Sequence, residues 1–576
     1  MIKIKSIQFP QEHSILGGLE LNFCDNNGTP ADTIIIAGEN GTGKTTILEE
    51  IYKIMKYECD CKDLKLEVLC DGVPNTIKYC GENEQHGIFN GEKKYYVTEV
   101  ILNENSNEKK YQELIKEEIK FSSIYSTVNI NFIRNKNGIE LSTVEKNVKS
   151  IKSDANIANE VVNFLLRTRA DDTEKLNRAY ENGNDLEKIK PQLDRFKNAF
   201  NYMFENKLKV EGVEQNNILF KTTQENKPFF IDNLSSGEKQ IVFRGAFLLK
   251  DKEALNGAVV LIDEPEISMH PKWQQKILDY YRKLFLDNNK QTSQIIVSTH
   301  SNFIIENALK LDNCVIIALQ ENNQVKKIIK RDGTFILPAV TAEEINYHVF
   351  NITSIGYHIQ LFGYLHSLME KHFSKDMNIK EVDDKIKDNK SLLYKNVLQD
   401  SKGNSCEWEH NFVDTKGKPK TTTYYTICCF IRNAIDHPDN LPSQTKKEYE
   451  DDLQYSIEIL IDLIRLNISI KDYYIQLFGY FQKITGINEI LDIDNKIKNN
   501  QSLLSKNVLQ DSKGSPCQWI YGSTNYETIC CFIRNAIDHR DNLPNQTKTE
   551  YTDDDLKYSI EILIELIKLA KSGSLK

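Results

Sequence analysis

GENGTGKTT, at residues 38–46, is the stretch of sequence that decides the fold of the first half of this chain. A short apolar run at residues 33–37 precedes it, and a helical pattern at residues 47–55 follows it. Glycines let such a loop curl until its backbone N–H groups surround a phosphate, and the N-terminus of the next helix adds a favourable dipole. The spacing G-x-x-x-x-G-K-[ST] between a strand and a helix therefore predicts a P-loop in an α/β domain.

Each position of this loop has an expected task. Lys44 reaches the β- and γ-phosphates of ATP, and the Thr45 hydroxyl is a ligand of Mg²⁺, so ATP and Mg²⁺ are the predicted cofactors. The nucleotide-binding residues expected from the loop are Asn40, Gly41, Gly43, Lys44, Thr45 and Thr46. The alternative is a glycine-rich turn with a chance lysine, and three further motifs count against it.

Two apolar runs end in polar side chains. Residues 258–262 end in Asp263 and Glu264, and a buried parallel strand that delivers two carboxylates suits Mg²⁺ binding by Asp263 and activation of water by Glu264. Residues 294–299 form a second buried strand, which ends in His300. A lone histidine at a strand end is usually structural, but its place in this ordered series favours a catalytic role.

The stretch LSSGEKQ, at residues 234–240, precedes a strongly apolar helix and alone would be a helix start capped by a serine. Beside a P-loop, it resembles the signature motif of ABC-type ATPases, which closes on the γ-phosphate held by the other subunit. The resemblance implies a homodimer through the ATPase heads, and it makes His300 the switch that senses the γ-phosphate. The nucleotide-binding residues that it implies are Ser235, Ser236, Gly237 and Glu238.

The resemblance covers about residues 1–335. Residues 266–271 read EISMHP at the D-loop position, and this form is similar to SMC/RecF-like and OLD-like ATPases more than to transporter ATPases. One departure is that no Q-loop glutamine is identified, although a strand is expected at residues 124–132. A charged helical insert at about residues 133–225 lacks sustained heptads, so no long coiled-coil arm is expected.

Further strands and a linker complete the first half. Strands are expected at residues 2–9 and 19–23, and a hairpin is expected at residues 314–329. A linker segment, residues 336–356, is expected to contain a helix at 341–352.

The second half of the chain contains one sequence twice. ICCFIRNAIDH occurs at residues 427–437 and again at residues 529–539. Flanking matches extend each unit to about a hundred residues with helical periodicity, which predicts tandem helical bundles at residues 357–468 and 472–570. Residues 411–422 are expected to be a loop.

The repeated stretch contains R-N-x-x-x-H where a helix is about to end. This resembles the HEPN superfamily, many members of which are metal-independent ribonucleases that work as dimers. The resemblance implies that the two repeats supply both halves of one RNA-cleaving site. The catalytic residues that it implies are Arg432, Asn433, His437, Arg534, Asn535 and His539.

The chemistry of these residue types fits RNA cleavage. A pair of imidazoles could take the proton of the 2′-OH and give one to the leaving 5′-oxygen, and arginine could hold the phosphate. The need for a 2′-OH selects RNA over DNA. The alternatives are that the histidine caps the helix, that Arg432 pairs with Asp436 at i+4, and that the domains only bind or scaffold.

Composition sets broad limits. The 576 residues carry a net charge of -10, which argues against an extensive DNA-coating surface. The apolar runs are too short for a membrane span, and the first residues alternate like a strand and not like a secretory signal. The twelve cysteines form no zinc-like pairs and are not expected to form disulfides, so a cytoplasmic location is predicted.

Together these features predict an α/β ABC-ATPase head with a helical insert, followed by two all-α HEPN-like bundles in tandem. The layout resembles the ATPase-controlled anticodon nucleases, which implies an ATP-gated ribonuclease of prokaryotic antiviral defence that acts on RNA such as tRNA. One alternative is a defence sensor or assembly ATPase, similar to the Septu type, whose HEPN units bind a separate effector or regulator. A lower alternative is a DNA-repair ATPase, and an oligomer larger than the dimer stays open.

Overall fold

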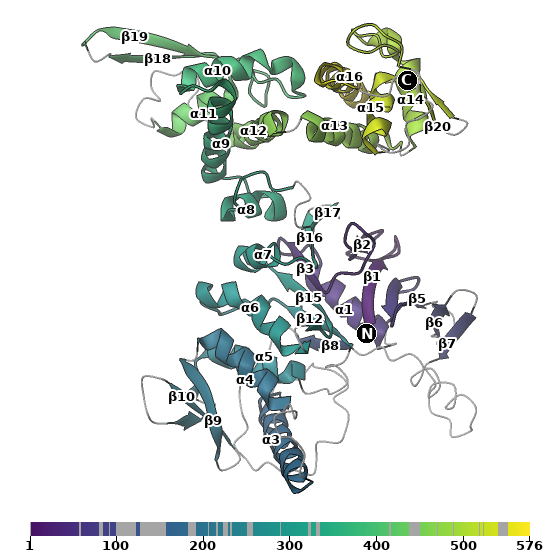
Figure 1. The fold of residues 1–576 in the computed structure, drawn as a ribbon, viewed down its shortest axis with the longest axis vertical. Coiled ribbons are helices and arrows are strands. Elements are labelled where there is room, and N and C mark those ends of the chain that lie inside the picture. The colour runs from purple at the N-terminus through teal and green to yellow at the C-terminus, as the bar shows by residue number, and fades with distance from the viewer. Residues whose placement is uncertain are drawn as a thin grey trace. The chain divides into compact units, whose positions relative to one another are not determined.

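The computed structural model describes residues 2–56, 59–79, 85–90, 93–98, 123–126, 157–182, 192–205, 207–214, 217–222, 228–230, 233–249, 257–287, 290–320, 324–329, 334–413, 416–436, 450–468, 470–487, 489–517, 519–521, 524–538 and 551–575. These residues fall into two compact units. The first unit comprises residues 1–335 and 348–351, and the second comprises residues 336–347 and 352–576 (Figure 1). Each unit is described by itself.

The first unit is built on a six-stranded sheet of β3 (Thr33–Gly38), β8 (Ser123–Ser126), β12 (Val259–Asp263), β15 (Gln294–Thr299), β16 (Cys314–Gln320) and β17 (Gln324–Ile329). Their order is β17-β16-β3-β15-β12-β8, and all neighbours are parallel except β17, which is antiparallel to β16. β3, β12 and β15 are buried along their whole length, which explains their continuous apolar sequences. The three buried strands and the hairpin predicted after them are confirmed.

A second, antiparallel sheet consists of β1 (Ile2–Gln8), β2 (Glu20–Asn22), β4 (Lys65–Cys70), β5 (Val73–Tyr79), β6 (Gln85–Asn90) and β7 (Lys93–Thr98), in the order β2-β1-β4-β5-β6-β7. Helix α1 (Lys44–Met55) shares a core with both sheets: Ile4 of β1, Ile51 of α1 and Ile34 of β3 belong to one buried cluster. The strands expected near the N-terminus are found as β1 and β2. The sequence did not predict β4 to β7.

Helices α5 (Ser236–Leu249), α6 (Pro271–Leu284) and α7 (Asn302–Ala308) also belong to the first unit, together with the short strands β13 (Leu286–Asp287) and β14 (Lys290–Gln291). The predicted insert contains α3 (Ile157–Glu181), α4 (Gln192–Phe204), β9 (Leu208–Glu214) and β10 (Asn217–Thr222), and β11 (Phe229–Phe230) follows directly after it. The prediction of a helical insert is therefore corrected at its C-terminal end. Residues 208–214 and 217–222 pair as antiparallel strands, and Phe220 of β10 is fully buried.

The second unit begins with α8 (Ala342–Phe350), which the sequence predicted as the linker helix and whose end lies in the first unit. The first repeat contains α9 (Ile355–Phe373), α10 (Ile379–Asp388), the 3-10 helix η6 (Lys390–Leu392), β18 (Trp408–Val413), β19 (Pro419–Tyr424), α11 (Ile427–Asp436) and α12 (Glu450–Ile468). The second repeat contains, in the same order, α13 (Ile470–Thr485), α14 (Ile490–Asn499), η8 (Gln501–Leu503), β20 (Trp519–Tyr521), β21 (Thr524–Tyr526), α15 (Ile529–Asp538) and α16 (Asp553–Lys571). The duplication in sequence is thus a duplication of a whole domain.

Each repeat contains a β-hairpin, which corrects the prediction of all-α bundles. In the first repeat the expected loop at residues 411–422 lies inside the β18–β19 hairpin. The β-branched and aromatic residues 421–424 favour a strand, and the Trp408 ring stacks on Tyr424 with their centroids 4.5 Å apart. This stacked pair closes the base of the hairpin.

The two repeats form a single body. One buried apolar cluster runs through both, from Leu361 of α9 in the first repeat to Leu563 of α16 in the second. At their junction the Lys571 ammonium lies 4.7 Å from the ring centroid of Tyr394 and 5.3 Å from that of Tyr480. Among the described residues, no helix is long and apolar enough to cross a membrane.

Candidate functional site

The P-loop connects β3 to α1 and has the backbone shape that its glycines predict. Gly43 has a φ of 89°, in the left-handed region, and a Cβ atom at this position would lie 2.5 Å from Cδ2 of Leu16. Helix α1 has no acidic residue in its first turn and no side chain that caps its N-terminus. The N–H groups at the start of α1 therefore suit a phosphate.

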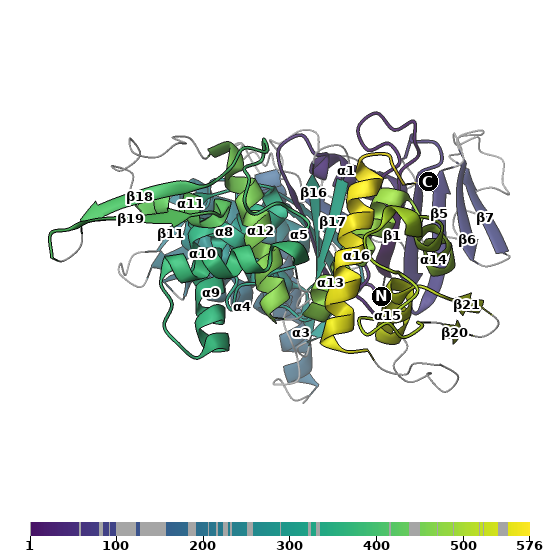
Figure 2. The ribbon, with the colours of Figure 1, turned by 90° about the horizontal axis from the view of Figure 1, so that it is seen from above.

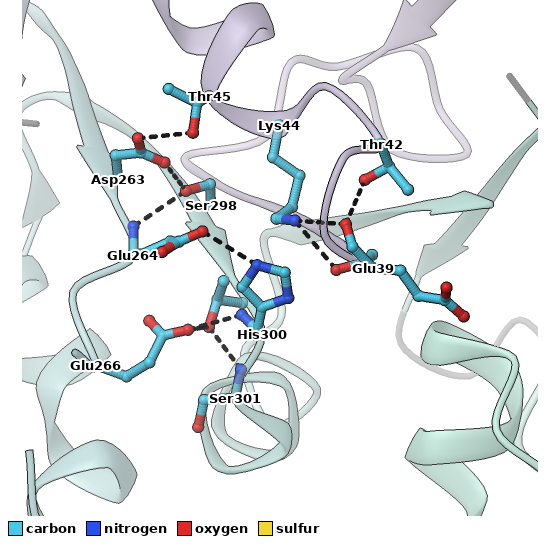
Figure 3. A network of polar contacts seen from close by, with 12 residues as sticks. Glu39, Thr42, Lys44, Thr45, Asp263, Glu264, Glu266, Ser298, His300 and Ser301 are labelled. Atoms are coloured by element: carbon cyan, nitrogen blue, oxygen red, sulfur yellow. Dashed lines mark hydrogen bonds and ion pairs between the residues drawn. The ribbon is translucent and has the colours of Figure 1, made fainter. Parts of the chain in front are cut away.

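Lys44 places a buried positive charge beside this loop. Its Nζ donates hydrogen bonds to the carbonyl oxygens of Gly38, at 3.1 Å, and Glu39, at 2.8 Å (Figure 3). Burial lowers the pKa of Lys44, while the carboxylates of Glu264 and Asp263 oppose this shift. A cation held next to an uncapped helix N-terminus fits the polyphosphate of a nucleotide.

Asp263 lies at the end of β12 and faces α1, as expected for a magnesium ligand. Its Oδ2 accepts a hydrogen bond from the Thr45 hydroxyl at 2.9 Å, and its Oδ1 accepts one from the Ser298 hydroxyl (Figure 3). Burial raises the pKa of Asp263, although the hydrogen bonds from Ser298 and Thr45 oppose this. The oxygens of Thr45 and Asp263, predicted to hold Mg²⁺, are thus brought together, and hard oxygen ligands fit that ion.

Glu264 and His300, which the sequence predicted separately as catalytic residues, lie together in the structure. The His300 Nε2 lies 3.0 Å from the Glu264 Oε1 (Figure 3). Glu264 has a φ of 41°, uncommon for a residue other than glycine, and its backbone N–H donates to the Ser298 hydroxyl at 3.1 Å. The backbone N–H of His300 donates to the Glu266 carboxylate at 2.6 Å, which fixes the loop after β15. A carboxylate positioned by an imidazole at the edge of a phosphate site can accept a proton from water.

The signature residues form the start of α5. Ser235 precedes the helix, and its backbone N–H and hydroxyl both donate to the Glu238 carboxylate, at 2.8 and 2.7 Å. Gly237 has no room for a side chain: a Cβ atom would lie 2.9 Å from Cζ3 of Trp273 and 3.2 Å from the carbonyl oxygen of Ser268. The signature therefore packs closely on the D-loop segment of its own chain.

Three residues of this site were not found from the sequence. Ser298 bonds both Asp263 and Glu264, and the Tyr125 hydroxyl lies 3.4 Å from the Asp263 Oδ2. Arg244 of α5 is fully buried and donates to the Asp263 carbonyl oxygen at 3.1 Å. The sequence signal for a role of Arg244 is its charge within the otherwise apolar run of α5. The missing Q-loop residue stays open, because residues 127–156 lie outside those described.

In the second unit, a buried carboxylate fixes the start of each motif helix. Asp383 accepts hydrogen bonds from the Thr426 backbone N–H, at 2.9 Å, and the Thr426 hydroxyl, at 2.7 Å, directly before α11. Asp494 binds Thr528 before α15 in the same way, at 2.9 and 2.6 Å. The two copies of the motif are therefore held by one structural device.

The side chains on these helices differ between the repeats. Arg432 forms an ion pair with Asp436, the alternative that the sequence had left open. Asn433 is buried, and its Nδ2 has no hydrogen-bond partner among the described residues, whereas the Asn535 Nδ2 donates to the Cys531 carbonyl oxygen at 2.9 Å. The Arg534 guanidinium lies 5.8 Å from the ring centroid of Phe478. The predicted catalytic residues His437 and His539 lie outside the described residues.

The packing of α11 and α15 bears on the predicted composite RNA site. α11 packs on α9, α10 and α12, and α15 packs on α13, α14 and α16. The main contacts between the described parts of the two repeats come instead from α12 with α13 and from α16 with η6. Whether the two motifs of one chain share a cleft therefore stays a prediction. In the part of the chain that the structure describes, no group of three or more His, Cys, Asp and Glu side chains could hold a metal ion.

The parallel sheet, the P-loop and the Asp263–Glu264–His300 cluster define a P-loop nucleotide-binding protein. Comparison with known families adds to this: residues 124–306 match the family model "AAA domain, putative AbiEii toxin, Type IV TA system". Within 84 residues the chain is 38% identical to the "Retron Vc95 probable ATPase" of Vibrio cholerae serotype O1 biovar El Tor, a match that spans 13% of this chain and 15% of that protein.

Solved structures that align with the chain include SMC head domains. One is an SMC head bound to the C-winged helix domain of ScpA, at 13% identity and a TM-score of 0.33. Another is the SMC head domain from Thermotoga maritima, at 13% identity and a TM-score of 0.30. Each alignment covers 57% of this chain and 98% of the other.

Proposed function

We propose that the first unit binds and hydrolyses ATP with Mg²⁺. The observation that carries this proposal is the network that joins Thr45 to Asp263 and Glu264 to His300 beside the buried Lys44. When bound, Mg²⁺ neutralises charge that develops on the phosphates. Lys44 binds the phosphates, and Asp263 and Thr45 hold the ion. Glu264 accepts the proton of the attacking water, and His300 orients the Glu264 carboxylate. ATP hydrolysis by the purified chain, lost in a Lys44→Ala variant, is the test.

We infer that this ATPase serves antiviral defence in a prokaryote. The family description for residues 124–306 and the name of the retron relative support this role. The signature motif at the start of α5 supports an ATP-dependent homodimer through the heads, because it needs a P-loop from a second copy.

For the second unit we propose ribonuclease activity on RNA such as tRNA, without a metal. The repeated Arg-Asn pair at the end of a helix, followed by a histidine, supports this function. In it, the histidines at 437 and 539 move protons between the 2′-OH and the leaving 5′-oxygen, and Arg432 and Arg534 bind the phosphate. The products would carry a 2′,3′-cyclic phosphate and a 5′-OH.

A second candidate function is favoured by the Arg432–Asp436 ion pair. This pair neutralises the arginine, which suits a unit that binds a separate effector or regulator and does not cut RNA.

The two candidates differ in their products. In cells that express the chain, sequencing of new 5′-OH RNA ends should detect cleavage by the wild type and none by a variant with both His437→Ala and His539→Ala. Cleavage that survives both substitutions would rule out the nuclease, and cleavage unchanged by Lys44→Ala would rule out ATP gating.

A further inference from the structure

The hairpins of the two repeats differ greatly in length. In both, a tryptophan and a tyrosine are paired in register at the base, Trp408 with Tyr424 and Trp519 with Tyr526. Between them the first repeat has residues 409–423, whereas the second has only residues 520–525. The second repeat folds with the short form, so the extra length of β18–β19 is not required by the fold. The hairpin extends away from the helices of its own repeat (Figure 2).

One face of the long hairpin carries a row of aromatic rings. Alternate residues of β18 share a face, and these are Trp408, His410 and Phe412. The ring centroids are 6.1 Å apart between Trp408 and His410, and 5.6 Å apart between His410 and Phe412, whose planes differ by only 24°. Trp408 is buried, with 2% of its surface exposed, but Phe412 is 39% exposed. The row therefore runs from the buried base of the hairpin to an exposed end, where part of the Phe412 ring is open to solvent.

Lysines lie beside the exposed end of this row. Lys420 is directly opposite Phe412 across the hairpin, so both side chains lie on the ring face. Lys416 and Lys418 occupy the turn, and all three lysines are exposed. Val413 belongs to the other face and is 66% exposed. Residues 409–423 contain these three lysines and two carboxylates, Glu409 and Asp414, so in a chain of net charge -10 this segment carries a net charge of +1 beside its stacking surfaces.

We propose that the ring face of β18–β19 binds single-stranded nucleic acid, with bases stacked on His410 and Phe412 and phosphates bound by the lysines. Base–aromatic stacking tolerates any sequence, and lysines neutralise the backbone, so the two features serve one ligand. An acidic protein segment would use the lysines but leave the rings exposed. An apolar partner would use the rings but not the charge of the lysines.

The position of the hairpin links this surface to the motif helix. The Trp408 ring packs edge-on against Phe430 of α11, with the centroids 6.0 Å apart. Phe430 is two residues before Arg432 on the same helix. The base of the hairpin therefore packs on the helix that carries the proposed ribonuclease motif. The binding proposal goes beyond that function, because it also holds for a unit that binds RNA without cutting it.

The test measures binding of the full chain to a fluorescein-labelled 20-nucleotide RNA in which every 2′-OH is methylated, so that cleavage cannot interfere. The main variant replaces residues 409–423 with the sequence of residues 520–525, the turn that the second repeat already uses. Its Kd should rise at least about tenfold, and the slope of log K against log salt should fall by about two, for three lysines lost. Phe412→Ala should raise the Kd roughly tenfold through the loss of one stacking platform.

Val413→Ala is the matched control, because it removes an exposed apolar side chain from the opposite face of the same hairpin. It should leave the Kd and the melting temperature unchanged. Binding by the replacement variant within twofold of the wild type would overturn the proposal, and so would equal weakening by Val413→Ala and Phe412→Ala. Displacement of the RNA by poly-glutamate with no effect of Phe412→Ala would also overturn it. The Kd of a DNA strand of the same sequence shows whether the protein distinguishes the two sugars. Tight binding of either strand that depends on Phe412 supports the proposal.

Discussion

At the scale of single residues, the cluster around Glu264 makes the sharpest prediction. Glu264→Gln keeps the shape of the side chain but removes the carboxylate, proposed as the base, that hydrogen-bonds to His300. ATP hydrolysis should fall by roughly 10²- to 10⁴-fold, the usual contribution of a general base, while ATP binding persists. Steady-state hydrolysis and equilibrium binding of ATP by the purified chain measure the two effects.

Glu39→Gln is the control for this prediction. Glu39 is exposed, and it binds Lys44 through its backbone carbonyl, so its carboxylate should not matter. A Glu264→Gln rate within tenfold of the wild type would contradict the assigned role.

A second prediction concerns His358 of α9, at the position that Tyr474 occupies in the second repeat. Its Nε2 lies 3.0 Å from the Ser456 hydroxyl, and its Nδ1 has no partner among the described residues. Burial, with a smaller effect of Arg432, lowers the pKa of His358 to about 3. The unfolded chain, with an ordinary histidine pKa of about 6.5, then binds more protons than the folded chain between these values, so stability falls as the pH drops.

The free energy of unfolding of this unit should fall by about 2 kcal/mol between pH 7 and pH 5 through His358 alone. The His358→Tyr variant, which places the residue of the second repeat in the first, should lose this part of the pH dependence. Urea unfolding at several pH values measures it. An identical pH dependence in the variant and the wild type would refute the role of His358.

At the scale of elements, the start of α11 depends on Asp383. Asp383→Asn removes the charge of the carboxylate that accepts hydrogen bonds from the Thr426 backbone N–H and hydroxyl. These hydrogen bonds should weaken, at a cost of about 1–3 kcal/mol in the free energy of unfolding. Amide hydrogen exchange in α11 should therefore become faster, while α15, held by Asp494, serves as an internal reference in the same molecule. Asp384→Asn is the matched control, because Asp384 is half-exposed and pairs with Lys380 on the surface. Equal exchange rates in the two variants would show that Asp383 does not fix the helix.

The elements also show what the sequence could predict. The strands β3, β12 and β15 were found because parallel strands buried on both faces are continuous apolar runs, and the latter two lead into Asp263 and His300. The hairpin β18–β19 was missed because its exposed residues resemble a loop, and only pairing across the hairpin reveals the strand. Ser298 and Tyr125 could not be assigned, because their roles depend on the neighbour β12 in the folded sheet. The sequence predicts a site residue well where the end of an apolar strand marks its position. It predicts a site residue poorly where the role depends on contacts between strands that are distant in the sequence.

At the scale of the whole molecule, the signature and the P-loop argue for sites shared between two copies. In each chain the signature packs on its own D-loop through Gly237, and the P-loop presents an uncapped helix N-terminus. If each site combines a P-loop from one copy with a signature from the other, Lys44→Ala and Ser235→Arg disable different halves of it. Either variant alone should be inactive. When the two variants are mixed in equal amounts, half of the dimers contain one copy of each variant. One of the two sites in such a dimer is intact, so up to about a quarter of the wild-type ATPase rate should return.

A second mixture distinguishes shared sites from a general rescue by mixing. When the Ser235→Arg chain also carries Glu264→Gln, the mixture should not recover, because the intact P-loop would then lack its base. Steady-state ATP hydrolysis measures both mixtures, and sedimentation shows that dimers are present. Full activity of Ser235→Arg on its own, or no recovery in the first mixture despite dimers, would mean that each chain completes its own site.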